Sequence, residues 1–140
     1  METNDDLFVV LKSLVHRVNL DVKPYVPAGC SIKEHLKSGI VDIERITLYS
    51  SKKIKFLMEV LTEVDDKRLA NASFLDYLVC NKGLIASNWK GLKLIFAGTI
   101  YRNFKGELFV RSLSWDESWE WNFVPLSAVF SKNCVLVLLG

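Results

Sequence analysis

Few residue types in this sequence could perform nucleophilic chemistry. It has two histidines, His16 and His35, and Cys30 lies five residues before His35. A cysteine beside a histidine can act as an activated nucleophile. However, the pair spans the start of a predicted helix, and no strained turn or glycine-rich oxyanion hole surrounds it. We therefore expect these side chains to be structural or solvent-exposed, and a hydrolase of unrecognised type is the last-ranked alternative.

Metal and cofactor binding have little support. The three cysteines, Cys30, Cys80 and Cys134, fit neither a disulfide framework nor a zinc spacing. Adjacent acids at Asp65-Asp66 and Asp116-Glu117 fall in predicted turns without calcium-loop spacing. The glycines form no nucleotide-binding motif. The sequence thus predicts no metal, no cofactor and no catalytic residue, and we do not expect an enzyme.

Aromatic side chains are the most distinctive feature of the second half of the chain. Trp119, Trp121 and Phe123 alternate, so in a strand one face carries all three. Large aromatic residues usually cover a core. The polar residues between these three, Glu120 and Asn122, would form a solvated face, which supports that interpretation.

A second group of residues falls near predicted strand ends, where loops commonly form binding pockets. Rings beside arginine could stack on sugars or on the bases of single-stranded nucleic acid, so this group is the candidate ligand-binding site. The net charge of +2 gives no support to general nucleic-acid binding, which we do not expect. The group comprises Trp89, Tyr101, Arg102, Arg111 and Trp115.

Three lysines, Lys52, Lys53 and Lys55, are predicted to lie in the first turn of a helix, where cations oppose the helix dipole. Such a cluster is usually a solvated helix start, but it could contact an acidic partner or a phosphate group. Because the placement breaks a local rule, the cluster stays a candidate.

The elements that position these residues are mainly helical in the first half. Apolar residues at helical spacing and capping signals mark four segments, whereas the β-branched stretch 40–49 favours a strand. Helices are predicted over 5–18, over 32–38, from Ser50 or Ser51 to Val64, and from Ser73 to Gly83.

From Leu92 the pattern changes to strands joined by tight turns, which is typical of antiparallel neighbours. Gly106 suits a hairpin loop, and Pro125 ends a strand. Gly98, inside the first of these strands, predicts a bulge or a close approach by a helix or a large aromatic side chain. Strands are expected over 92–102, 107–115, 119–124 and 128–139.

Helices followed by strands predict the α+β class. We expect one α+β domain over 1–140, with N-terminal helices (about 1–88) packed on a C-terminal four-stranded antiparallel meander (about 92–139). A fifth strand is added if 43–49 pairs with an edge. The length of 140 residues and the 50% hydrophobic content suffice for one core. The expected core residues are Leu11, Leu14, Leu57, Leu61, Leu78, Leu94, Phe96, Val110, Trp121, Val135 and Val137.

One block of the sequence resembles a block in small bacterial proteins of unknown function. Its segments are Trp89-Lys-Gly91, Ala97-Gly-Thr-Ile-Tyr-Arg102, Leu108-Phe-Val-Arg111 and Leu113-Ser-Trp115. The resemblance implies no activity, ligand or site residue. It suggests only that Trp89–Trp121 forms one unit with a sequence pattern of its own.

The predicted function is a non-enzymatic interaction or binding module whose partner is a protein or a second copy of the chain. The high apolar content supports this, as does the run Val135–Leu139, which would be an aggregation-prone edge if left uncovered. The acidic N-terminus does not resemble a secretory signal, and no apolar run is long enough to span a bilayer. We therefore expect a cytoplasmic location and no membrane partner.

Overall fold

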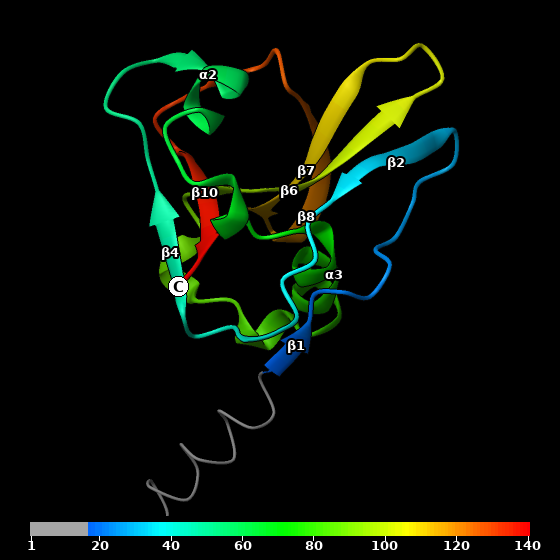
Figure 1. Ribbon diagram of the computed structural model, residues 1–140. Helices are drawn as coiled ribbons and strands as arrows, with labels where there is room; N and C mark the ends of the chain where they lie inside the picture. The colour runs from blue at the N-terminus through cyan, green and yellow to red at the C-terminus, as the bar shows by residue number, and fades with distance from the viewer. Residues whose placement is uncertain (1–16) are drawn as a thin grey trace, which may run out of the picture.

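The computed structural model describes residues 17–140 and is built around a six-stranded mixed sheet (Figure 1). The sheet has the order β4-β10-β6-β7-β8, and β2 also pairs with β6. Two small two-stranded sheets, β1-β3 and β5-β9, lie outside it. The strands are β1 (Arg17–Asn19), β2 (Cys30–His35), β3 (Ile40–Asp42), β4 (Ile46–Tyr49), β5 (Lys55–Phe56), β6 (Lys93–Asn103), β7 (Leu108–Asp116), β8 (Ser118–Pro125), β9 (Val129–Phe130) and β10 (Cys134–Leu139).

Helices are short in the described part of the chain. The two α-helices are α2 (Leu57–Leu61) and α3 (Ala72–Cys80), and single 3₁₀ turns cover Asp66–Arg68, Lys82–Leu84 and Ser87–Trp89. Asn71 caps α3, because its side-chain oxygen accepts a hydrogen bond from the Phe74 N–H at 3.2 Å. No helix within residues 17–140 is long and apolar enough to cross a bilayer.

Strand β6 shares one of its edges between two partners. Its first residues pair in parallel with β10, and its last residues pair antiparallel with β2. The segment Leu69–Ala70 fills the gap between them, since Ala70 donates to Val137 O (3.0 Å) and accepts from Gly98 N (2.9 Å). On the opposite edge, the pairing of β6 with β7 shifts register between Phe96 and Tyr101. The bulge expected at Gly98 is present here. Another element also approaches Gly98 closely, but it is the backbone of 69–70 and not the expected helix or large aromatic side chain.

The central strands of the sheet, β6 and β10, are buried on both faces. Helix α3 covers one face, where Phe74 and Leu78 pack with Leu94 and Phe96 of β6. Helix α2 covers the other, where Leu57 and Val60 pack with alternate residues of β6 and β10. Burial on both faces explains why β6 and β10 are apolar without alternation. Seven predicted core residues are buried, namely Leu57, Leu78, Leu94, Phe96, Val110, Val135 and Val137. Leu61 and Trp121 are half-buried, and Leu11 and Leu14 lie outside the described residues.

The predicted α+β class is wrong. Strands make up 43% of the structure and helices 19%, and the part expected to be helical holds β1 to β5. The four-stranded antiparallel meander is also wrong. Strands β6, β7 and β8 do follow one another antiparallel, but β10 inserts between β4 and β6 and runs parallel to β6.

Individual helix predictions fail for identifiable reasons. The helix expected over 32–38 is strand β2, because pairing with β6 outweighs a local capping signal. The helix expected from Ser50 to Val64 shrinks to α2, since 55–56 pair with β9 instead. Of the helix expected over 5–18, only residues 17 and 18 are described, and they belong to β1. The strand favoured over 40–49 is present as β3 and β4, and β4 pairs with β10 at the edge of the sheet.

Replacing Gly98 by alanine tests the junction between β10, 69–70 and β6. An added Cβ would lie 2.6 Å from Leu69 O and 2.8 Å from the Ala70 carbonyl carbon, and both are backbone atoms that cannot move independently. We expect Gly98→Ala to lower the free energy of unfolding by about 3 kcal/mol, the upper end for overpacking. Urea denaturation would measure it. Gly91→Ala is the control, because nothing lies within 4 Å of its added Cβ. Equal losses of unfolding free energy in both variants would contradict the close contact between Gly98 and the backbone of residues 69–70.

Candidate functional site

The structure brings together two members of the predicted strand-end group and separates the other three. Tyr101 and Arg111 are both buried, and the Tyr101 hydroxyl lies 3.5 Å from Arg111 Nη1. Arg102 is exposed near the end of β6. Trp89 is half-buried against the core on the α3 side. Trp115 is exposed, with Lys90 Nζ 3.9 Å from its ring centroid. These five side chains therefore do not line a common pocket.

Arg111 is the most deeply buried charge in the described chain, at 1% exposure. Its Nη1 donates to Asp76 Oδ1 of α3 at 2.8 Å. The guanidinium carbon lies 4.3 Å from the Trp121 ring centroid and 5.6 Å from that of Tyr25, so the cation sits against two aromatic rings. The guanidinium is thus already neutralised and covered, and it is not exposed to a phosphate or a sugar.

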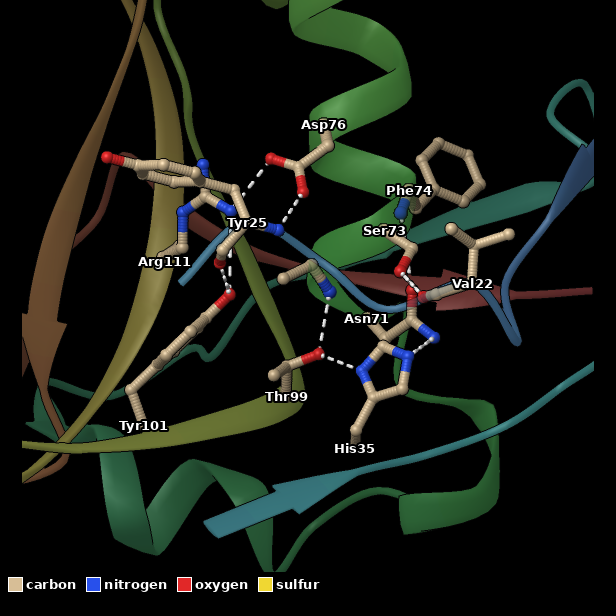
Figure 2. Close-up of polar contacts among 11 residues, drawn as sticks. Val22, Tyr25, His35, Asn71, Ser73, Phe74, Asp76, Thr99, Tyr101 and Arg111 are labelled. Atoms are coloured by element: carbon tan, nitrogen blue, oxygen red, sulfur yellow. Dashed lines mark hydrogen bonds and ion pairs between the residues drawn. The ribbon is translucent and has the colours of Figure 1, made fainter. Parts of the chain in front are cut away.

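Arg111 and its neighbours Asp76 and Tyr101 hold the loop after β1 against the sheet (Figure 2). Asp76 Oδ2 accepts from the Tyr25 N–H at 2.7 Å, and the Tyr101 hydroxyl donates to Tyr25 O at 2.8 Å. Nearby, the Ser73 hydroxyl donates to Val22 O. Residues 23–27 of this loop lie outside any helix or strand, so side chains supply hydrogen bonds to the loop backbone.

His35 belongs to a second structural network. Its Nδ1 lies 2.8 Å from Thr99 Oγ1 and its Nε2 lies 3.1 Å from Leu20 O. Asn71, fully buried, donates to Leu20 O and Leu36 O, both at 2.7 Å. Figure 2 shows His35 between Thr99 and Asn71, where the chain enters α3. Sequence reasoning missed Asn71 and Asp76. Asn71 was recoverable as a strong cap, whereas nothing local marks Asp76 as the partner of Arg111.

The Cys30–His35 nucleophile has no geometric support. The two residues lie at opposite ends of strand β2, where Cys30 pairs with Asn103 and His35 with Thr99. Both ring nitrogens of His35 are engaged as described above. His16 lies outside the described residues. Within residues 17–140, no three His, Cys, Asp or Glu side chains gather in an arrangement that could hold a metal ion.

The alternating aromatic residues of β8 lie on the face that α3 covers in part. Trp119 is buried in the core, while Trp121 and Phe123 are half-buried. Trp121 and Phe123 contact each other at 5.2 Å between ring centroids, and Phe123 also contacts Tyr101. Most of this aromatic surface therefore serves packing, as the core interpretation expected.

A different surface collects exposed apolar side chains. Four of the nine large apolar side chains exposed in residues 17–140 lie around β5 and the start of α2, with exposures of 50% to 74%. Phe56 and Val129 are directly opposite each other in the β5-β9 pair, and Met58 follows in the first turn of α2. This surface lies at the end of the molecule away from β1 (Figure 1). We call Ile54, Phe56, Met58 and Val129 the apolar ridge.

The lysine cluster borders the apolar ridge. Lys52 and Lys53 lie in the turn before β5, and Lys55 lies in β5, so none of them stands in a helical first turn and the expected dipole conflict does not arise. With neighbouring side chains they line a cavity of about 370 Å³. We call this cavity the basic pocket, and its lining residues are Tyr49, Ser50, Ser51, Lys52, Lys53, Lys55 and Glu63.

Glu63 is the one acid that lines the basic pocket, and it is already engaged. It accepts a hydrogen bond from the Tyr49 hydroxyl at 3.0 Å and lies 3.6 Å from Lys55 Nζ. The bond to Glu63 raises the pKa of Tyr49 above its ordinary value. No ion pair joins Lys52 or Lys53 to a carboxylate within residues 17–140. The pocket therefore presents uncompensated positive charge.

Comparisons with protein-family models, with curated proteins and with solved structures gave no match. The resemblance of Trp89–Trp121 to small bacterial proteins of unknown function thus stays a prediction.

Removing the carboxylate beside Arg111 tests whether the buried ion pair holds the loop. Asp76→Asn leaves a buried guanidinium without a counter-charge, so we expect the free energy of unfolding to fall by about 3 kcal/mol. Urea denaturation at neutral pH measures this. The control is Glu63→Gln, which breaks the pair with Lys55. That lysine is 33% exposed where Arg111 is 1% exposed, so the loss of stability should be less than about 1 kcal/mol. A loss no larger than that of the control would show that the pair is not structural.

The hydroxyl of Tyr101 predicts an alkaline limit to stability. Burial raises its pKa above the ordinary value of 10.0, and the neighbouring Arg111 offsets part of that effect. Above pH 10 the unfolded chain loses this proton while the folded chain retains it, so stability falls as pH rises. Tyr101→Phe should be about 1 kcal/mol less stable at neutral pH, having lost its bond to Tyr25, yet lose less stability between about pH 9 and 11.

Thermal unfolding monitored by circular dichroism across this pH range would show the difference. Tyr25→Phe, at an exposed position, is the control and should follow the wild-type profile. If the stability of wild type and of Tyr101→Phe fell in parallel with rising pH, Tyr101 would not be the cause of the alkaline loss of stability.

Proposed function

We propose that this protein is a non-enzymatic protein-interaction module and that the apolar ridge, with its adjoining lysines, is the contact surface. The observation that carries the proposal is the gathering of four exposed apolar side chains at one end of the molecule beside Lys52 and Lys53, which form no ion pair within residues 17–140. Exposed apolar side chains that gather in one region commonly mark an interaction site.

The energetics of the apolar ridge support this proposal. Fully burying a side chain such as Phe or Met is favourable by about 1.5–3 kcal/mol, and that contribution is forfeited while Phe56 and Met58 face solvent. The local fold does not require Phe56 and Met58 to be exposed, because Leu57 and Val60 are the residues that anchor α2 to the core. A partner that covers the ridge would recover this free energy.

Charge narrows the class of partner. The unpaired cations of Lys52 and Lys53 border the ridge, so a complementary surface would be apolar at its centre and acidic at its rim. Such opposite charges speed association and exclude wrong partners. The alternative use of the strand-end group as a sugar or nucleic-acid site has less support, since Arg111 is committed to Asp76.

Site-specific photo-crosslinking tests the proposal. Phe56 is replaced by p-benzoyl-phenylalanine in the full chain, which is expressed in its native host and irradiated. We expect a discrete cross-linked product from position 56, because a partner packs on the ridge. The control places the same residue at Phe104, which is 85% exposed in the β6-β7 hairpin loop. Figure 1 shows that the tip of this hairpin lies apart from α2. Mass spectrometry identifies the partner, and a product of two identical chains would mean that the partner is a second copy.

Two results would overturn the proposal. One is the absence of any product from position 56. The other is the same set of products from both positions, which would mean contact by random collision. Sedimentation velocity at increasing concentration then separates the two kinds of partner, since a monomer at every concentration excludes the second copy.

A further inference from the structure

We propose that the basic pocket binds the phosphate group of a phosphorylated side chain on the protein partner. This inference rests on the proposed function, because the phosphorylated residue would be presented by the partner that covers the apolar ridge. The pocket is formed by the end of β4, the turn 50–54, β5 and Glu63 beyond α2.

The charge of the basic pocket matches a phosphate monoester better than a carboxylate. Three lysines line it, and the single charge of Glu63 offsets one of them, Lys55, at 3.6 Å. Lys52 and Lys53 leave a net charge of +2 in the pocket. A phosphorylated side chain carries about −1.5 to −2 at neutral pH, whereas a carboxylate carries only one charge. A phosphate group therefore neutralises the pocket and a single carboxylate does not.

The shape and the hydrogen-bond donors of the pocket suit the same ligand. Its volume of about 370 Å³ is many times the share of a water molecule, roughly 30 Å³, so a hydrated phosphate group fits. The Ser51 hydroxyl donates to Lys53 O at 2.9 Å and so fixes the turn that carries the lysines. The hydroxyl of Ser50 makes no hydrogen bond within residues 17–140 and can donate to a phosphate oxygen.

The positions of the pocket and the ridge identify the form of the partner. The basic pocket and the apolar ridge share the segment 53–56, where Lys53 and Lys55 line the pocket while Ile54 and Phe56 belong to the ridge. One partner segment can therefore lay apolar side chains on the ridge and place a phosphorylated residue in the adjoining pocket. The proposed ligand is thus a phosphopeptide with apolar residues beside the phosphorylated position.

The test is a titration of the purified full chain, followed by amide chemical shifts in two-dimensional NMR spectra. The probes are phosphoserine and inorganic phosphate, with acetate and chloride at equal ionic strength as controls. We expect saturable shifts at residues 50–55 with both phosphates and none with acetate or chloride. A flat response to phosphate, or equal responses to all four anions, would overturn the proposal.

A double variant locates the binding. Lys52→Gln combined with Lys53→Gln should weaken phosphate binding at least about tenfold, because both uncompensated charges are gone. The matched control is Lys23→Gln with Lys105→Gln, which removes the same charge from exposed lysines that do not line the pocket. Equal weakening of phosphate binding in both variants would mean a general charge effect and would overturn the basic pocket as the binding site. Unchanged spectra elsewhere in the chain show that each variant is folded.

The source of the phosphate and the proposed function are tested separately. Binding to vesicles of phosphatidylcholine with phosphatidylserine, more strongly than to phosphoserine, would assign the pocket to a lipid headgroup and overturn the phosphopeptide. A cross-link at Phe56 without phosphate binding would leave the interaction module standing and remove this inference. Phosphate binding without that cross-link would remove the apolar ridge as the contact surface and, with it, the phosphopeptide on which this inference rests.

Discussion

The fold depends on one steric constraint, the contact between Gly98 and the backbone of residues 69–70. Strand β6 has to serve β10 along its first half and β2 along its second half on the same edge. The two partners diverge, and the space between them is filled by a peptide segment whose oxygen lies 2.6 Å from where a side chain at position 98 would begin. Only glycine leaves room there. The same segment leads directly into α3, so this contact also sets where the helix begins and which face of the sheet it covers.

Buried charge in this protein serves architecture. Arg111 and Asp76 join the sheet to α3. Asp76 and Tyr101 hold the loop after β1 through the peptide groups of Tyr25. An arginine between aromatic rings resembles a ligand site when only its sequence is read. In the structure the Asp76 carboxylate and the rings of Trp121 and Tyr25 contact the guanidinium, and its Nε has no partner within the described residues. The surface left for recognition lies at the other end of the molecule, where apolar side chains face solvent.

The sequence predicted the antiparallel β6-β7-β8 segment well because its signals are local. Gly106 adopts a positive φ of 81° in the hairpin, and the alternation of Trp119 and Glu120 reports one covered face. Helix α3 was also predicted, although its cap is Asn71 and not Ser73. The predicted fold class was wrong because it depends on strand pairs that lie far apart in the sequence. Nothing near Cys30 or His35 signals that they pair with residues 99–103, and the parallel pairing of β10 with β6 leaves no local trace. The lysine cluster was noticed, but the apolar ridge depends on which side chains β9 and α2 leave uncovered, and sequence spacing does not give that.

The position of β10 in the sheet has a consequence for how the chain folds during synthesis. This strand follows every other described strand in sequence, yet it fills the space between β4 and β6 and pairs Leu136 with Tyr49. Until residues 134–139 leave the ribosome, β4 has no neighbour in the main sheet, and at about 5–20 residues per second that interval is on the order of ten seconds. Once β6 has been made, the edge of its first residues that β10 later occupies is still unpaired. An unpaired apolar strand edge is prone to aggregation, and truncation within β10 would leave β4 and this edge of β6 without their shared neighbour.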